Sequence, residues 1–279
     1  LILAFSGGEP LVRKDIYYLI ERAVEKNLVV NIASNGSLIN EKTASKLKRL
    51  GVRSITISLD AANEKMHDEF RNFNGLFKKA TNAIKLLVKH EIRVVVSFTP
   101  TIINYTEGSK VVDLAYKLGA NAVNMSEYVP AGRGTIEMSL PPKLLHNVIL
   151  EWIKMRKEYQ DKMQIIWHDC RVALLVPAED QDKYSGCGAG KLTARITSSG
   201  VLTPCVFLSS QAGNLKEEEF SSIWNNSNLL KSIRNRDLIS GNCVSCEHIK
   251  TCGGCRAVSM AHYGSPLKGD PSCWIKPEC

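Results

Sequence analysis

The sequence predicts an α/β fold: a partial (β/α)6 barrel followed by a small cysteine-rich domain. Over the first 130 residues, short apolar runs typical of strands alternate with segments whose apolar residues recur every three or four positions, as in helices. All nine cysteines lie at or beyond Cys170, after this repeat has ended. A doubly wound parallel sheet is the alternative arrangement of the same repeat.

Five apolar runs are expected to form parallel strands, because a helical segment follows each of the first four. The runs are Leu1–Phe5, Leu28–Ala33, Ser54–Leu59, Arg93–Phe98 and Ala122–Met125. The helical segments are Ile16–Lys26, Glu41–Leu50, Gly75–Lys89 and Val111–Leu118. Gly51 and Gly119 stand where two helices should end. Polar residues at the carboxyl ends of such strands are expected to line the site.

The second half of the chain has a different pattern. Residues 141–159 predict one more helix, and residues 141–184 as a whole are expected to connect a barrel domain, 1–140, to a C-terminal domain, 185–279. The runs Leu192–Thr197 and Val201–Phe207 flank Ser-Ser-Gly and predict a hairpin. Helices are expected around Phe220–Arg234 and near Arg256–Tyr263.

The cysteine spacing indicates a site for a soft metal. Cys243-x2-Cys246-x5-Cys252-x2-Cys255 is followed by Cys273, and Cys187-x12-Gly200-x4-Cys205 precedes it. Thiolates on short loops bind either zinc or iron–sulfur clusters, and spacing alone does not separate the two. Cys170 could complete such a ligand set or be a half-buried thiol. Cys279, the last residue, is expected not to be a ligand.

This layout resembles the seven-cysteine SPASM domain of radical S-adenosylmethionine (SAM) maturases. The resemblance implies one or two auxiliary [4Fe–4S] clusters on seven ligands: Cys187, Cys205, Cys243, Cys246, Cys252, Cys255 and Cys273. The family pattern has three residues between the last two of the close cysteines, whereas this chain has two, which leaves the pairing open. The interleaved ligation of the family would assign Cys255 to the group of Cys187 and Cys205. The alternative is that the four close cysteines share one site and that Cys187 and Cys205 bind nothing.

Three strand ends resemble motifs of the same family. Ser6-Gly7-Gly8-Glu9-Pro10 resembles its GGEP motif, Ser34-Asn35-Gly36 its TNG turn, and Ile57-Ser58-Leu59-Asp60 its SLDG segment, with Ala61 in place of glycine. The strand Val94–Thr99 resembles the one whose polar end approaches the SAM ribose. The SAM-binding residues implied are Gly7, Gly8, Glu9, Pro10, Asn35, Ser58, Asp60 and Ser97.

The resemblance implies an enzyme that reductively cleaves SAM to a 5′-deoxyadenosyl radical and oxidatively modifies its substrate. The substrate would be a peptide, or a tetrapyrrole or other cofactor precursor, and an electron donor such as ferredoxin or flavodoxin would be a partner. The CGGCRA segment at Cys252–Ala257 favours the cofactor precursor. No catalytic residue is assigned. The alternative is a non-catalytic zinc- or iron–sulfur-binding protein, a degenerate paralogue.

The CxxxCxxC loop that holds the family's catalytic cluster is not in this sequence, since no cysteine precedes Cys170. We expect that this loop and a first strand have been left out ahead of Leu1, and that the 279 residues alone do not cleave SAM. The net charge of +8 comes from lysines spread along the helices rather than from blocks, which predicts no nucleic-acid partner. No apolar run is long enough to span a bilayer and no signal peptide is evident, so a cytoplasmic protein without a membrane partner is expected.

Overall fold

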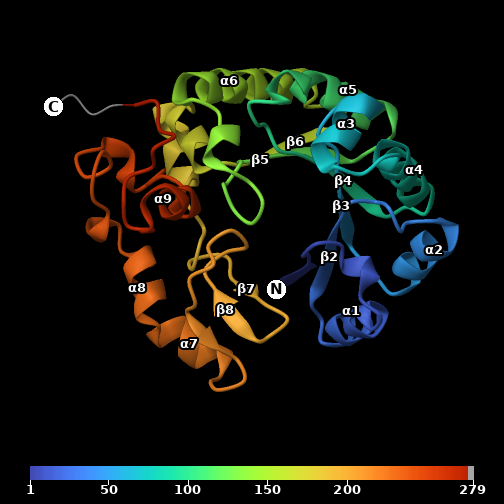
Figure 1. The fold of residues 1–279 in the computed structure, drawn as a ribbon, viewed down its shortest axis with the longest axis horizontal. Coiled ribbons are helices and arrows are strands. Elements are labelled where there is room, and N and C mark those ends of the chain that lie inside the picture. Colours follow the sequence, from blue (N-terminus) through green and yellow to red (C-terminus); the bar gives the residue numbers. More distant parts are fainter. Residues whose placement is uncertain (276–279) are drawn as a thin grey trace. The chain divides into compact units, whose positions relative to one another are not determined.

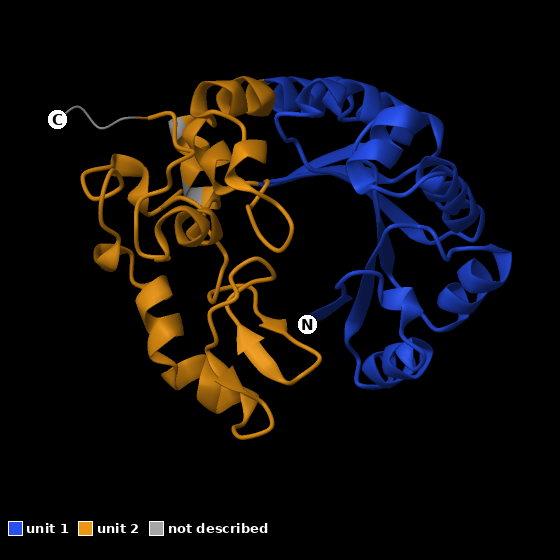
Figure 2. Cartoon of the chain, in the orientation of Figure 1, with its two compact units in different colours: residues 1–127, 151–168 blue, residues 128–150, 169–279 orange. Residues whose placement is uncertain are grey.

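The computed structural model describes residues 1–275, and Cys279 lies outside the described residues. The chain divides into two compact units, coloured separately in Figure 2. Unit 1 comprises residues 1–127 and 151–168, and unit 2 comprises residues 128–150 and 169–279.

Unit 1 is built on a parallel six-stranded sheet with strand order β1-β2-β3-β4-β5-β6 (Figure 1). The strands are β1 Ile2–Phe5, β2 Val29–Ser34, β3 Ser54–Ser58, β4 Arg93–Phe98, β5 Ala122–Ser126 and β6 Gln164–His168. Each strand pairs with its neighbour in sequence, whereas the order of a doubly wound sheet reverses at a switch point. The predicted partial (β/α)6 barrel is therefore confirmed, with six strands in place of five.

The helices that join these strands pack against one face of the sheet (Figure 1). They are α1 Ile16–Glu25, α2 Glu41–Arg49, α3 Glu64–Arg71, α4 Leu76–Lys89 and α5 Gly108–Lys117, and α6 Pro142–Glu158 precedes β6. Alternate strand residues such as Ile32, Ile55 and Val94 are buried on this face, as a period of two requires. Gly51 and Gly119 follow α2 and α5 with φ of 79° and 81°, the left-handed conformation that ends a helix.

Two elements of unit 1 differ from the prediction. β6 was expected to be part of a connection, but Gln164–His168 pairs with Ala122–Ser126 along its whole length. Trp152 of α6 fixes it there by donating from Nε1 to the carbonyl of Ile166 at 2.9 Å. α3 was also missed, because most of its residues are polar. Its N-cap is Asn63, whose side chain accepts from the N–H of Met66.

Unit 2 holds short elements joined by loops. They are β7 Arg195–Ile196, β8 Val201–Thr203, β9 Gly213–Asn214, α7 Phe220–Asn226, α8 Asn228–Arg234 and α9 Arg256–Tyr263. Short 3₁₀ helices, among them Cys170–Leu174, accompany these elements. The predicted hairpin is present but shorter, with β9 as a third antiparallel strand. The predicted helix Phe220–Arg234 is interrupted at Ser227, whose backbone is not helical.

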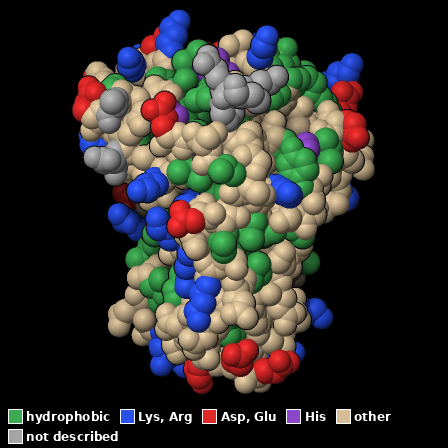
Figure 3. Space-filling model, turned by 90° about the vertical axis from the view of Figure 1, so that its left-hand side faces the viewer, with side chains coloured by type: hydrophobic (Ala, Val, Ile, Leu, Met, Phe, Trp, Pro, Cys, Tyr) green, Lys and Arg blue, Asp and Glu red, His purple; other side chains and the backbone are tan. Residues whose placement is uncertain are grey.

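On the face drawn in Figure 3, lysine and arginine side chains are scattered among acidic and neutral ones. The excess of positive charge, +8, is therefore not gathered into one block on that face. Among the described residues, no helix is both long and apolar enough to cross a membrane.

Candidate functional site: polar strand ends and two groups of thiols

The carboxyl ends of β1 to β4 bring the predicted SAM-binding residues to one edge of the sheet. Glu9 follows β1, Asn35 follows β2, Ser58 ends β3 and Ser97 lies next to the end of β4. The parallel register pairs Ser58 with Ser97, so both side chains point to the same face. That face is the one that the helices leave uncovered, because Ile57 and Val96, which directly precede Ser58 and Ser97, point to the opposite face and are buried.

Glu9 ties the first two strand ends together. Both oxygens of its carboxylate lie 3.0 Å from Ser34 Oγ, which donates to them. One of these oxygens also accepts a hydrogen bond from the backbone N–H of Asn35 at 2.8 Å. It also accepts from the N–H of Leu11, which caps the 3₁₀ helix Pro10–Val12. A carboxylate held in this way is a preorganised partner for an ammonium group.

The turn before Glu9 leaves room for a ligand. A Cβ built on Gly7 or Gly8 would meet no atom within 4 Å. Open space beside a glycine backbone and a fixed carboxylate fits the amino-acid end of SAM, whose charged groups need both a close backbone approach and a countercharge.

The carboxylate of Asp60 is hydrogen-bonded to other residues of unit 1. Asp60 is fully buried, and its carboxylate accepts hydrogen bonds from the Arg71 guanidinium at 2.5 Å and from the Thr99 N–H at 3.3 Å. Its backbone N–H donates to Nδ1 of buried His67 at 3.1 Å. Burial, offset in part by Asp60, lowers the pKa of His67, so the imidazole is neutral. The assignment of Asp60 to cofactor binding stays a prediction, and on these contacts Asp60 would act through the loop that it orders.

Two polar residues of β5 escaped the sequence analysis. Asn124 is in register with Ser97, and its Nδ2 donates to Ser126 Oγ at 2.8 Å, which in turn lies 3.3 Å from Ser97 Oγ. Asn124 Oδ1 is buried and has no hydrogen-bond partner among the described residues, so it is an acceptor available to a ligand. The alternation of β5 could have revealed both residues, because they share the face of Ser97.

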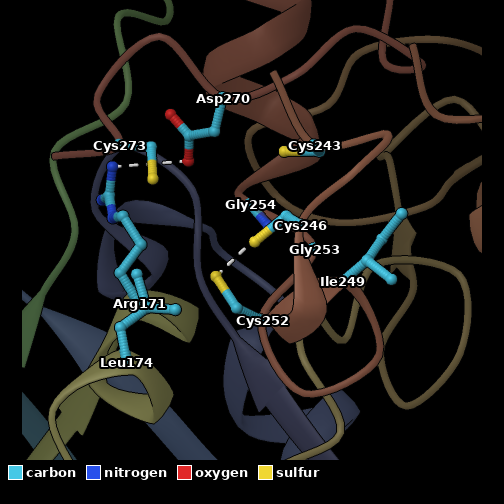
Figure 4. Close-up of a pocket in the computed structure, with 10 residues that line it drawn as sticks. All are labelled: Arg171, Leu174, Cys243, Cys246, Ile249, Cys252, Gly253, Gly254, Asp270 and Cys273. Atoms are coloured by element: carbon cyan, nitrogen blue, oxygen red, sulfur yellow. Dashed lines mark hydrogen bonds and ion pairs between the residues drawn. The ribbon is translucent and has the colours of Figure 1, made fainter. Parts of the chain in front are cut away.

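Four of the predicted metal ligands line one pocket of unit 2, drawn in Figure 4. Cys243, Cys246, Cys252 and Cys273 surround it together with Arg171 and Asp270. Burial raises the pKa of Cys273 to about 11 and also raises that of Cys243. These thiols would lose their protons only on binding a metal, which is the usual coupling for thiolate ligands.

The other three predicted ligands gather in an apolar cluster. Cys255 is buried there beside Ala189 and Leu208, and Cys187 and Cys205 pack against the same cluster. The Cys255 thiol donates a hydrogen bond to the sulfur of Cys187. This contact, helped by backbone N–H groups, outweighs the effect of burial and lowers the pKa of Cys187 to about 5. None of the eight cysteines in the described part of the chain forms a disulfide.

Two glycines explain why neighbouring cysteines face different groups. Gly253 and Gly254 both have left-handed backbones, with φ of 64° and 68°. They reverse the chain between Cys252 and Cys255, so that the first lines the pocket and the second joins the apolar cluster. Left-handed residues in succession strongly favour glycine.

Buried charges hold these loops in place. The Arg171 guanidinium binds both oxygens of Asp169 at 2.9 Å and reaches Asp270 at 3.4 Å. Asp270 accepts the N–H of Cys255 at 2.8 Å. Arg256, equally buried, donates to the carbonyls of Pro266 and Lys268 at 2.8 and 2.9 Å. Two guanidinium groups beside the thiols suit a site that carries negative charge when it is occupied.

Comparison with known proteins establishes the family to which the chain belongs. Residues 2–115 match the model of the radical SAM superfamily, and residues 187–256 match that of an iron–sulfur cluster-binding domain, SPASM. An AdoMet-dependent heme synthase of Methanosarcina barkeri is 31% identical over 99% of this chain and 83% of its own length. The chain belongs to the radical SAM superfamily. S-adenosylmethionine and [4Fe–4S] clusters are therefore its cofactors, and the prediction of a radical SAM enzyme is confirmed.

Other radical SAM proteins align over nearly the whole chain. The mycofactocin maturase MftC of Mycobacterium tuberculosis is 30% identical over 96% of this chain and 69% of its own length. The crystal structure of Streptococcus suis SuiB bound to S-adenosylmethionine superposes with a TM-score of 0.80 at 21% identity, covering 98% of this chain and 66% of SuiB. Native anSMEcpe with bound AdoMet and a peptide gives a TM-score of 0.74 at 22% identity, and the match covers 98% of this chain and 80% of anSMEcpe. The structural likenesses support the fold.

Proposed function

We propose that this radical SAM enzyme oxidatively modifies a tetrapyrrole or a similar cofactor precursor. The observation that carries the proposal is the presence in one chain of a polar edge on a (β/α)6 sheet and of two groups of thiols in a separate unit. When bound, SAM and a reduced cluster supply a hydrogen-abstracting radical, and auxiliary clusters supply acceptors for the electron that an oxidation releases.

The residues of unit 1 would bind and orient SAM. Glu9 would hold the ammonium group, and the Gly7-Gly8 backbone would allow close approach. Ser58 and Ser97 would face the ligand from neighbouring strands, and Asn124 would offer its unpaired oxygen. Asp60 would fix the loop after β3 through Arg71 and Thr99.

The residues of unit 2 would bind two auxiliary clusters. Cys243, Cys246, Cys252 and Cys273 form one set of four thiols, and Cys187, Cys205 and Cys255 belong to another. Such sets fit iron–sulfur clusters, which are held by cysteine thiolates.

The choice of substrate rests on the relatives and on one loop. The heme synthase aligns with nearly all of the chain, which favours a tetrapyrrole. Arg133, in the Pro130–Gly134 loop, is exposed and could pair with a carboxylate such as a propionate. A peptide is the second candidate, because the mycofactocin maturase is nearly as similar at 30% identity and SuiB has been solved with its precursor peptide SuiA.

The experiment compares the 279-residue chain with a version that carries a CxxxCxxC loop ahead of Leu1. Both are reconstituted anaerobically with iron and sulfide and incubated with SAM, dithionite and either an iron porphyrin bearing propionates or a candidate peptide. The loop-bearing enzyme should form 5′-deoxyadenosine, and mass spectrometry should show a porphyrin product of changed mass. Modification of the peptide alone would replace the first candidate by the second, and the absence of 5′-deoxyadenosine would contradict both.

A further inference from the structure

A third arginine lies beside the thiols of unit 2. Arg236 begins the 3₁₀ helix Arg236–Leu238, which follows α8. Its Nη2 donates to the carbonyl of Cys187 at 3.2 Å and to that of Ser185 at 3.4 Å. These two hydrogen bonds hold the guanidinium against the loop that carries Cys187.

Two glycines leave room for this guanidinium. A Cβ built on Gly186 would lie 2.7 Å from Arg236 Nη2, and one built on Gly253 would lie 2.6 Å from Arg236 Nη1. Gly186 directly precedes Cys187, and Gly253 directly follows Cys252. The guanidinium therefore lies between two loops that carry predicted ligands, one from each group of thiols.

One nitrogen of Arg236 has no hydrogen-bond partner. Nη1 is buried, and it donates to no atom among the described residues. Arg256 differs in this respect, because both of its terminal nitrogens donate to backbone carbonyls. A buried donor without a partner is costly, so Nη1 is a donor for an acceptor that the polypeptide does not supply.

The charge of Arg236 also acts on Cys187. The pKa of Cys187 is lowered chiefly by the hydrogen bond from Cys255, and the Arg236 guanidinium contributes to the decrease. A guanidinium group is a permanent cation. The group of Cys187 therefore lies in the field of a fixed positive charge.

We propose that Arg236 donates from Nη1 to a sulfur of the cluster held by the Cys187 group and thereby raises the reduction potential of that cluster. The inference rests on the proposed function and deepens it. Cluster potentials depend on net charge and on hydrogen bonds to the sulfurs. Reduction adds one electron and hence one negative charge, which the guanidinium stabilises. No covalent bond forms or breaks at Arg236, so this residue tunes the cluster without being a ligand.

The two groups of thiols then differ in local charge. Beside the pocket, Arg171 is compensated by two buried carboxylates, those of Asp169 and Asp270. Within the described part of the chain, the hydrogen bonds of Arg236 go to carbonyl oxygens instead, which leave its charge in place. We therefore expect the cluster of the Cys187 group to be the stronger acceptor for the electron that substrate oxidation releases.

A redox titration tests the proposal. The 279-residue chain is reconstituted anaerobically with iron and sulfide as wild type, Arg236→Gln, Arg236→Lys and Lys231→Gln, and the reduced clusters are followed by EPR at set potentials. The transition that persists in Cys246→Ala, which removes a thiol of the other group, belongs to the Cys187 group.

For this transition, Arg236→Gln should lower the ratio of reduced to oxidised cluster about tenfold at a fixed potential, which is a shift of about 59 mV for a one-electron couple. Arg236→Lys keeps the charge and should shift less. Lys231→Gln removes an exposed charge of α8 and should shift nothing. An unchanged potential in Arg236→Gln at wild-type iron content overturns the proposal but leaves the proposed function standing.

A second measurement does not depend on the iron content of Arg236→Gln. The wild-type chain is produced with ¹⁵N-labelled arginine, reconstituted, reduced and examined by pulsed EPR, which detects nitrogen nuclei hydrogen-bonded to cluster sulfur. The wild type should show a weak nitrogen coupling that Arg236→Lys lacks. No arginine coupling in the wild type, or the same coupling in Arg236→Lys, overturns the proposal. A chain that takes up no iron overturns both the proposal and the proposed function.

Discussion

The backbone N–H of Cys255 donates a 2.8 Å hydrogen bond to Oδ2 of Asp270, the carboxylate oxygen that Arg171 also contacts. The other oxygen of Asp270 accepts the N–H of Ser272 at 2.8 Å, next to Cys273. One buried side chain thus positions a cysteine of the apolar cluster and the loop of a cysteine of the pocket. The geometry of the two thiol groups therefore depends on a residue that is not itself a ligand.

Replacing Asp270 by alanine should destabilise the metal-free chain by about 3–5 kcal/mol, because the N–H groups of Cys255 and Ser272 and part of a buried ion pair lose their partner. Asp270→Asn should cost less, since its amide oxygen still accepts one N–H group. Urea denaturation measures the free energy of unfolding. Iron content after reconstitution should also fall further in Asp270→Ala than in Asp270→Asn. Asp237→Ala, at an exposed aspartate, is the control and should change stability by about 0.5 kcal/mol at most. Equal stability of D270A and wild type would contradict the role of Asp270.

Glu9→Gln should weaken SAM binding about 10- to 100-fold, because the neutral amide loses the charge-assisted interaction with an ammonium group. Equilibrium binding of radiolabelled SAM to the loop-bearing, reconstituted enzyme measures the effect. Glu21→Gln, on the exposed side of α1, is the matched control and should bind SAM as the wild type does. Wild-type affinity in E9Q would show that Glu9 serves only its contacts with Ser34 and Asn35.

The repeating part of the fold could be predicted from the sequence because its signals are local. The strand Arg93–Phe98 and the helix Arg256–Tyr263 have the predicted ends, since apolar periodicity and flanking residues define them. β6 lacked such a signal. The strand Gln164–His168 is short, and its pairing with β5 depends on the position of the preceding helix α6. α3 is mostly polar, yet its His67 and Asp68 are buried by contacts that periodicity does not reveal.

The residue types of the candidate site could be proposed from the sequence, whereas the way the fold arranges them could not. The spacing of Cys252 and Cys255 left their pairing open, because it does not show that Gly253 and Gly254 reverse the chain between them. The contact between Arg171 and Asp270 joins residues 99 positions apart and has no sequence signal at all. Long-range contacts of this kind follow from the fold and not from local pattern.

Acidification should destabilise unit 1 through His67. Burial lowers the pKa of His67 in the folded chain below the usual value of 6.5, so below about pH 6.5 the unfolded chain binds the additional proton and folding loses stability. The loss continues until the pH falls through the folded pKa. Protonation in the fold would also remove the Nδ1 acceptor of the Asp60 N–H. Thermal unfolding between about pH 7.5 and 5.5 should therefore show a smaller drop in Tm for His67→Asn than for wild type. An equal drop in both would rule out His67 as the cause.

Gly254→Ala should disrupt the separation of the two thiol groups. An alanine Cβ at this position would lie 2.5 Å from the Cβ of Asp270, and the backbone has a φ of 68°. The clash would displace either Asp270 or the chain between Cys252 and Cys255.

Gly264→Ala is a matched control for this variant, because Gly264 has nearly the same φ, 67°, and open space around its Cβ position. The control should lose about 1–2 kcal/mol from left-handed strain alone and should still bind iron as the wild type does. Gly254→Ala should lose more and should bind less iron per chain, because the steric conflict lies between the two groups of ligands. Urea denaturation and iron analysis of the two variants, side by side, separate strain from clash. If both bind iron equally well, the close approach of Gly254 to Asp270 is not needed for the cysteine sites.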